Sequence, residues 1–198
     1  MPCMNNNDIE LVLFDLGGVL VELGEELFPS AWLPDHQGFG LSEWFSSETA
    51  IKFETGLISS KEFISEFKRK LSITVSDYKV HAAFEAWPKG LFPSTDKLLN
   101  RLKLDYRIAV LSNSNQIHEP IIMQTFGLES RIDDVFFSHI IGHSKPSDAA
   151  FNHVLTELDF KPKQVMFFDD NAANVLAART LGMQAYQVSS PVEVVNYI

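Results

Sequence analysis

The sequence predicts an α/β fold, in which a parallel five-stranded sheet carries helices on both faces and a small helical cap is inserted after the first strand. Three observations predict this fold. Five short apolar runs are spread along the chain, helical patterns separate the last four runs, and an aromatic-rich helical stretch follows the first. Strands and helices that alternate in this way form parallel, right-handed sheets. We therefore expect a core domain of residues 8–20 and 88–198, and a cap domain of residues 21–87.

The first predicted strand, Leu11–Phe14, lies in the stretch IELVLFDLGGVL and ends at Asp15. Gly17 and Gly18 follow, and they allow the backbone to approach a ligand closely. Ligands of open α/β sheets bind beyond the carboxyl ends of the strands. Asp15 is therefore a candidate nucleophile or metal ligand, although an aspartate that merely starts a turn after the strand is an equally good interpretation of this stretch alone.

Residues 21–87 predict a run of about four helices without a clear strand, and their many aromatic side chains are expected to form the core of the cap. Ser59 and Glu62 have the spacing of a capping box at the start of a helix that reaches Leu71. A second amphipathic helix is expected at residues 76–87.

Beyond the Pro- and Gly-containing linker PKGLFP, strands and helices alternate. The expected strands are residues 108–111, 135–137, 164–168 and 185–188. The expected helices are residues 94–104, 116–126, 148–158, 174–181 and 191–198, the fourth of which stops at Gly182.

The composition fits a folded protein with a well-buried core, because 45% of the 198 residues are apolar and 21% are charged. The net charge of −10 argues against nucleic acid as a partner. The single cysteine, Cys3, suits a reducing compartment. We see no apolar run that is long enough for a membrane span. We therefore expect a cytoplasmic monomer or homodimer without nucleic-acid or membrane partners.

Polar residues directly follow four apolar runs, at positions that we interpret as strand ends. They are Asp15, the pair Ser112–Asn113, Lys145 after Ile140-Ile141-Gly142, and the pair Asp169–Asp170. Each one alone suits a turn or a helix start. At one edge of one sheet, however, the acidic residues can hold a divalent metal, and the lysine and hydroxyl can neutralise and orient a phosphate. Together they indicate phosphoryl transfer.

Four ordered motifs carry a resemblance to a known family. FDLGGVL, LSNSN, SKP and FFDDNAANVLAARTLGM resemble the four motifs of the haloacid dehalogenase-like hydrolases, from Leu11 to about Val188. The last motif is similar to that of bacterial sugar-phosphate phosphatases and of the phosphatase domain of soluble epoxide hydrolases. The resemblance implies a Rossmann-like core, with the cap between the first and second motifs closing over small substrates.

The resemblance also implies how the phosphate is handled. Asp15 would attack phosphorus and become an aspartyl-phosphate. Ser112 and the backbone of Asn113 would bind the phosphoryl oxygens, next to Gly17. Lys145 would balance the charge between nucleophile and phosphate.

For the metal, the resemblance implies Mg²⁺ held by Asp15, Asp170 and the carbonyl of Gly17. Asp169 would either bind the metal itself or hold the residues that bind it in place. Asn174 lies where many relatives have a further acid. A cation is needed because a phosphate dianion and a carboxylate repel each other.

Gly17 departs from the family pattern, because most family phosphatases carry there an aspartate that protonates the leaving oxygen. Such general acid catalysis is typically worth about 10²- to 10⁴-fold in rate. We therefore expect a slow phosphatase, or a substrate with an acidic leaving oxygen such as a sugar 1-phosphate. A related subgroup with Asp-Leu-Gly at this point includes enzymes assigned to such substrates. Possible substitute acids are Glu22, Asp35, His36 and His143. His143 is the best of them because it lies two residues before Lys145 and imidazole titrates near neutrality.

The sequence thus predicts a Mg²⁺-dependent phosphatase of small phosphorylated metabolites, with sugar phosphates as candidates. A 2-haloacid dehalogenase-type hydrolase is an alternative, although Asp170 has little use in a metal-independent enzyme. A catalytically weakened binding or regulatory protein is another, favoured by Gly17 and disfavoured by the intact Asp15 and Lys145.

Overall fold

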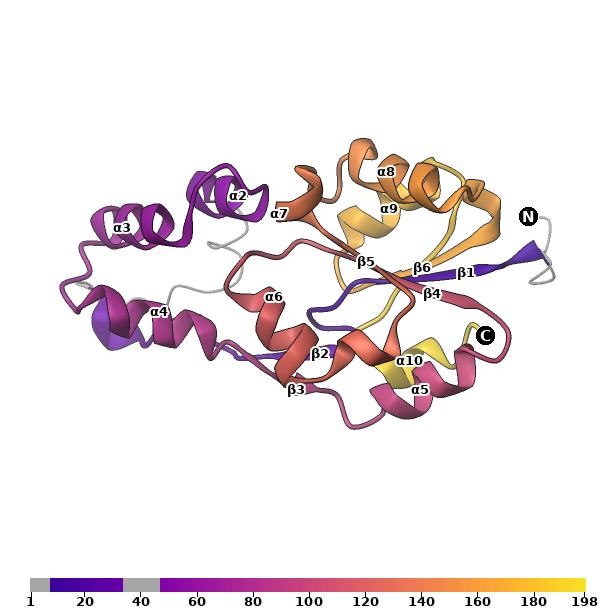
Figure 1. The fold of residues 1–198 in the computed structure, drawn as a ribbon, viewed down its shortest axis with the longest axis horizontal. Coiled ribbons are helices and arrows are strands. Elements are labelled where there is room, and N and C mark those ends of the chain that lie inside the picture. The colour runs from indigo at the N-terminus through magenta and orange to yellow at the C-terminus, as the bar shows by residue number, and fades with distance from the viewer. Residues whose placement is uncertain (1–7, 34–46) are drawn as a thin grey trace.

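The structure is a computed structural model that describes residues 8–33 and 47–198. Its centre is a five-stranded sheet in the order β5-β4-β1-β6-β7 (Figure 1). The strands are β1 (Leu11–Phe14), β4 (Arg107–Ser112), β5 (Asp134–Phe137), β6 (Val165–Asp169) and β7 (Gln184–Gln187). All four pairings between neighbouring strands are parallel. The predicted α/β class and five-stranded parallel sheet are therefore confirmed.

Helices cover both faces of this sheet (Figure 1). They include α5 (Thr95–Leu102), α8 (Asp148–Leu158), α9 (Ala172–Thr180) and α10 (Pro191–Val194). Successive residues of a strand point to opposite faces, so Val12 and Phe14 of β1 lie in the apolar cluster that contains residues of α5 and α10. Leu11 and Leu13 lie in the other cluster, with residues of α8 and α9. Burial of both faces explains why the strands read as continuous apolar runs in the sequence.

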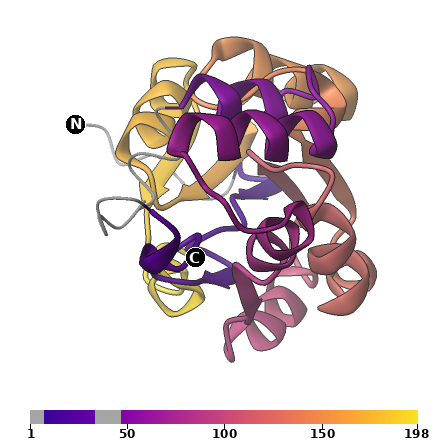
Figure 2. The same cartoon turned by 90° about the vertical axis from the view of Figure 1, so that its left-hand side faces the viewer.

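The segment between β1 and β4 contains the helices α2 (Glu48–Glu54), α3 (Ser60–Leu71) and α4 (Asp77–Glu85), and a short 3₁₀ helix, η2 (Ser30–Trp32). Their aromatic and aliphatic side chains form a third apolar cluster. Seen from the end of the molecule where these helices lie, α2 and α3 are in front of the sheet (Figure 2). We keep the predicted domain boundaries as a proposal and call residues 21–87 the cap.

The predicted capping box at the start of α3 is present. The Ser59 hydroxyl accepts a hydrogen bond from the backbone N–H of Glu62 at 3.3 Å. In return, the Glu62 carboxylate accepts one from the backbone N–H of Ser59 at 2.9 Å. The two side chains thus satisfy two N–H groups that the first turn of a helix leaves without partners.

The expectation of no strand near the cap was wrong. A short antiparallel pair forms from β2 (Val21–Leu23) and β3 (Pro88–Leu91), so most of the predicted linker is a strand. Pro88 is tolerated because it is the first residue of its strand. The pair connects the segment that enters the cap with the segment that leaves it. Next to this pair, the indole N–H of Trp87 donates to the carbonyl of Gly24 at 2.8 Å.

Two further segments differ from the prediction. The expected helix 116–126 is split into α6 (His118–Pro120) and a π-helical turn, η3 (Ile121–Thr125). The apolar run before Lys145 is not a strand but a short helix, α7 (Ser138–Ile141). Short 3₁₀ helices are also present, η4 (Leu128–Arg131) and η5 (Pro162–Gln164). Within residues 8–33 and 47–198, no helix combines the length and the apolar character that a membrane crossing requires.

Candidate active site

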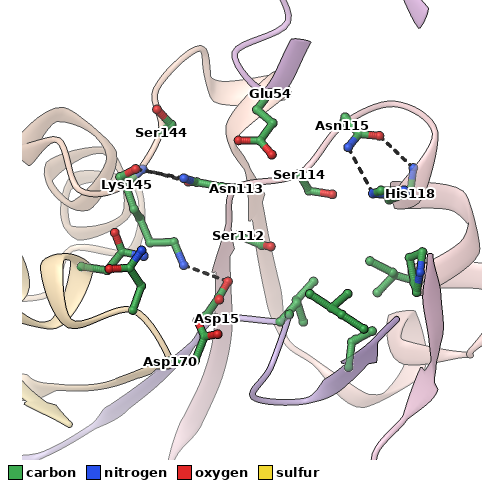
Figure 3. A pocket seen from close by; sticks show the side chains of 18 of the residues that line it. Asp15, Glu54, Ser112, Asn113, Ser114, Asn115, His118, Ser144, Lys145 and Asp170 are labelled. Atoms are coloured by element: carbon green, nitrogen blue, oxygen red, sulfur yellow. Dashed lines mark hydrogen bonds and ion pairs between the residues drawn. The ribbon is translucent and has the colours of Figure 1, made fainter. Parts of the chain in front are cut away.

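A cavity of about 530 Å³ lies beyond the carboxyl ends of β1, β4 and β6. The core contributes Asp15, Ser112 and Lys145 to its lining, and the cap contributes Ile51 and Glu54 (Figure 3). The volume is typical of sites for small molecules. The parallel sheet accounts for the convergence, because it brings the carboxyl ends of strands that are far apart in sequence to one edge.

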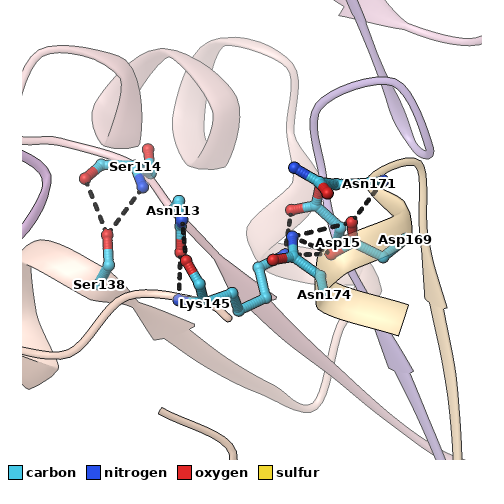
Figure 4. Close-up of polar contacts among 8 residues, drawn as sticks. All are labelled: Asp15, Asn113, Ser114, Ser138, Lys145, Asp169, Asn171 and Asn174. Atoms are coloured by element: carbon cyan, nitrogen blue, oxygen red, sulfur yellow. Dashed lines mark hydrogen bonds and ion pairs between the residues drawn. The ribbon is translucent and has the colours of Figure 1, made fainter. Parts of the chain in front are cut away.

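Lys145 joins two buried carboxylates on the floor of the cavity (Figure 4). Its Nζ lies 2.8 Å from Oδ1 of Asp15 and 2.6 Å from Oδ2 of Asp169. Burial raises the pKa of Asp15 to about 7, against the opposing effect of Lys145. Although burial alone would lower it, the pKa of Lys145 is raised because both carboxylates stabilise the ammonium. These charges tolerate burial because they are paired.

Asp169 has hydrogen-bond donors on both of its oxygens. Its Oδ2 accepts from Lys145, and its Oδ1 accepts from the backbone N–H of Asn171 at 2.8 Å. The side-chain amide of Asn174 donates to both oxygens at 3.0 Å (Figure 4). Asp169 therefore fixes the position of the Lys145 ammonium and ties it to the first turn of α9.

Asp170 adds a third carboxylate to Asp15 and Asp169 and lies closer to solvent. We call these three residues the acidic group. One oxygen each of Asp15, Asp169 and Asp170 lie within 4.8 Å of one another. Partial burial and the neighbouring Asp169 carboxylate raise the pKa of Asp170. Hard oxygen donors at this spacing fit a divalent cation such as Mg²⁺.

Gly18 permits the approach of Asp170 to the turn after β1. Its φ of +74° is one that side chains other than glycine rarely adopt, and a Cβ there would lie 2.6 Å from Oδ2 of Asp170. A glycine is thus required both by the backbone conformation and by the carboxylate packed against it.

Ser112 and Asn113 end β4 at the same edge. Ser112 is buried and faces the cavity near Asp15 (Figure 3). The side chain of Asn113 binds the backbone of Lys145 in both directions, donating to its carbonyl at 2.9 Å and accepting from its N–H at 2.8 Å. This clamp holds the loop that carries Lys145 against β4, although Lys145 follows a helix rather than the predicted strand.

Gly17 has no side chain to offer a proton, and a side chain at this position would have to displace the end of the Leu23 side chain. A Cβ at this position would lie 2.9 Å from Cδ1 of Leu23, which β2 places over the turn. Glu22 and His143, two of the expected substitute acids, are exposed and do not line the cavity. Asp35 and His36, the other two, lie outside the described residues.

Two cavity residues beyond Asn113 were not predicted, Asn115 in the loop and His118 at the start of α6. Asn115 Nδ2 lies 3.1 Å from Nδ1 of His118, and Nε2 of His118 lies 2.8 Å from the carbonyl of Phe84 in the cap. A carbonyl only accepts, so Nε2 carries the proton and Nδ1 accepts from Asn115. Burial lowers the pKa of His118 to about 4, so the ring is neutral. The segment reads as an ordinary helix in the sequence, and no local pattern indicates this contact.

Ser114 and Glu54 were also not predicted. Ser114 Oγ is buried and has no hydrogen-bond partner within the described part of the chain, and this residue lines the cavity. Glu54 is buried at the end of α2 and reaches toward the cavity from the cap (Figure 3). Their positions depend on how the cap meets the core, which no motif in the sequence encodes.

Comparison with known proteins gives a consistent result. The family model of the haloacid dehalogenase-like hydrolases matches residues 9–182. A D-ribitol-5-phosphate phosphatase of Bacteroides thetaiotaomicron is 24% identical over 200 residues, covering 90% of this chain and 91% of its own. A phosphoglycolate phosphatase of Pasteurella multocida is 25% identical, covering 87% and 82%. A crystal structure of a family enzyme from B. thetaiotaomicron, in complex with magnesium and inorganic phosphate, superposes with a TM-score of 0.76 at 27% identity, covering 90% of this chain and 93% of that one.

Proposed function

The chain belongs to the haloacid dehalogenase-like hydrolases, and we propose that it is a Mg²⁺-dependent phosphatase of small phosphorylated metabolites that works through an aspartyl-phosphate. One observation carries the proposal. The ammonium of Lys145 lies between the carboxylates of Asp15 and Asp169, at the floor of a cavity that also contains Asp170 and Ser112. Phosphatases among the relatives support the same reaction.

In the proposed reaction, an oxygen of Asp15 attacks phosphorus and the bond to the leaving oxygen breaks. Lys145 offsets the charge of the approaching phosphate and holds the Asp15 carboxylate in place. The hydroxyl of Ser112 donates to a phosphoryl oxygen. Mg²⁺, held by Asp15, Asp170 and the carbonyl of Gly17, would neutralise the negative charge on phosphate and nucleophile. Asp169 keeps Lys145 oriented throughout.

For the substrate, we propose a sugar or polyol phosphate. The relative from B. thetaiotaomicron acts on D-ribitol 5-phosphate, and a cavity of about 530 Å³ has room for a sugar or polyol phosphate of that size. Hydroxyl groups of such a substrate suit the polar lining, in particular the buried Ser114 Oγ. We further propose a cytoplasmic monomer or homodimer, on the composition of the sequence alone.

The test is a panel of phosphorylated metabolites and 2-haloacids, assayed with and without Mg²⁺ and with Asp15→Asn as the control. Phosphate release that needs Mg²⁺ and disappears in the variant is the expected result. Halide release without metal would instead favour the dehalogenase alternative. No turnover across the panel would favour a weakened binding protein, for which the missing acid at Gly17 is the supporting observation.

A further inference from the structure

The proposed reaction, on which this inference rests, leaves one proton unaccounted for. Breaking the bond between phosphorus and an alcohol oxygen gives an alkoxide, which is a poor leaving group unless it is protonated. Gly17 supplies no acid, and the side chain of Leu23 occupies the adjacent space. The proton donor must therefore come from elsewhere in the cavity.

Five titratable side chains line the cavity among the described residues: Asp15, Glu54, His118, Lys145 and Asp170. They differ in where they lie relative to the nucleophile. His118 uses one ring nitrogen on Phe84 and the other on Asn115. Lys145 pairs with two carboxylates, and Asp15 and Asp170 belong to the acidic group at the end of the sheet. Glu54 is the lining acid that stands apart from this group.

Glu54 lies opposite the nucleophile. It is 6% exposed and ends α2 above the cavity, while Asp15 lies at its floor (Figure 3). Displacement at phosphorus places the attacking and leaving oxygens on opposite sides, roughly in line. A phosphate attacked by Asp15 therefore directs its leaving oxygen away from the floor, toward the cap.

We propose that Glu54 is the general acid and base of this enzyme. In the first step, an Asp15 oxygen bonds to phosphorus, the ester P–O bond breaks, and the Glu54 carboxyl gives its proton to the leaving oxygen, so that a neutral alcohol departs. In the second step, a water attacks phosphorus from the vacated side and gives a proton to the Glu54 carboxylate. The bond between phosphorus and Asp15 breaks, and phosphate, the Asp15 carboxylate and protonated Glu54 result. One residue serves both steps because the alcohol and the water occupy the same side.

Neighbouring elements bring further titratable groups near α2. Glu66 of α3 accepts a hydrogen bond from the Thr49 hydroxyl at 3.3 Å. On α7, which packs against α2, His139 pairs with Glu119 at 2.8 Å. On α2 itself, Glu48 pairs with Lys52 at 2.8 Å on the exposed side. Glu48 thus offers a matched control, since it is a glutamate of the same helix that does not line the cavity.

The test compares Glu54→Gln with Glu48→Gln on ribitol 5-phosphate and on p-nitrophenyl phosphate, whose leaving group needs no proton. For Glu54→Gln we expect kcat/KM on ribitol 5-phosphate to fall by about 10²- to 10⁴-fold. On p-nitrophenyl phosphate we expect a burst of about one nitrophenolate per site, because the first step proceeds and the second lacks its base. The wild type should lose kcat/KM on ribitol 5-phosphate at high pH, where a general acid is deprotonated, and Glu54→Gln should not show this loss. Glu48→Gln should behave as the wild type.

Equal losses on both substrates without a burst, or a change in KM alone, would overturn the assignment. Thermal melting checks the fold; if Glu54→Gln is unfolded, Glu54→Asp replaces it, and must lose more activity on ribitol 5-phosphate than on p-nitrophenyl phosphate. A wild type without Mg²⁺-dependent phosphate release would contradict the proposed function and this role together. An active wild type with an unimpaired Glu54→Gln would overturn the role of Glu54 alone.

Discussion

The ammonium of Lys145 lies 2.6 Å from the carboxylate of Asp169, and their side chains are only 1% and 0% exposed. In Asp169→Asn, Asp15 still compensates the ammonium, but one buried acceptor oxygen becomes an amide that faces the donors Lys145, Asn171 and Asn174. We therefore expect this variant to lower the free energy of unfolding by about 1–3 kcal/mol, measured by urea denaturation. Phosphatase activity should be lost as well, because Lys145 is no longer held between Asp15 and Asp169.

Asp134→Asn is the control for this prediction. Asp134 pairs with Arg107 at the same distance of 2.6 Å, but these side chains are 20% and 45% exposed. Exposed pairs contribute little, so the loss should stay below about 1 kcal/mol. Similar losses in the two variants would mean that burial does not set the strength of the Lys145 pair.

The parts of the fold that the sequence predicts are those with a local cause. The central strands β1, β4 and β6 are buried on both faces, so each one contains a continuous apolar run that is readable without a partner. By contrast, β2 and β3 are short, exist only as each other's partners, and contain Pro88 and Gly90, which read as linker residues. Their pairing spans the whole cap and leaves no local pattern.

The same distinction applies to the site. Asp15, Ser112 and Asp170 stand directly at or after strand ends, and the topology alone brings them together. Glu54 and His118 reach the cavity or the cap only because the cap packs on the core. The roles of all these residues stay proposals.

The N-cap residues of α3 and α5 show that the same residue type can make different contacts at two helix starts. Ser59 and Ser94 occupy the same position at the two helix starts, but only Ser59 accepts a capping hydrogen bond in the structure. We expect Ser59→Ala to lower the free energy of unfolding by about 1 kcal/mol, measured by urea denaturation. Ser94→Ala should change it by much less. Equal effects would show that the residue type, and not the hydrogen bond, determines the loss.

His118 makes stability depend on pH. Burial lowers its pKa to about 4, while an unfolded histidine titrates near pH 6.5. Between these values the unfolded chain binds a proton that the folded chain does not, so stability falls as the pH falls below about 6.5. The contribution should reach about 2 kcal/mol at pH 5 relative to pH 7.5. Urea denaturation at the two pH values measures it.

His118→Gln should remove this part of the pH dependence, although it also lowers stability at pH 7.5 because the ring contacts are lost. His81→Gln is the control. His81 lies in the cap on α4, with a side chain that is 41% exposed and 3.8 Å from Glu85. If His81→Gln flattens the pH dependence as much as His118→Gln does, the buried ring is not its source.

Gly18 allows a test of the metal site that leaves every carboxylate in place. In Gly18→Ala, the new Cβ would lie 2.6 Å from Oδ2 of Asp170, so this carboxylate must move. A displaced ligand should weaken Mg²⁺ binding by about 10- to 100-fold. Isothermal titration calorimetry measures the affinity directly, and the Mg²⁺ concentration that gives half-maximal phosphate release provides a second measure.

Gly142→Ala separates this displacement from backbone strain. Gly142 has the same φ of +74°, but a Cβ there meets nothing within 4 Å. Both variants therefore force alanine into the left-handed region, which costs roughly 1–2 kcal/mol of stability, and both should melt at lower temperature. Only Gly18→Ala should lose Mg²⁺ affinity. A loss of equal size in Gly142→Ala would assign the effect to strain in the backbone, and an unchanged affinity in Gly18→Ala would argue against Asp170 as a metal ligand.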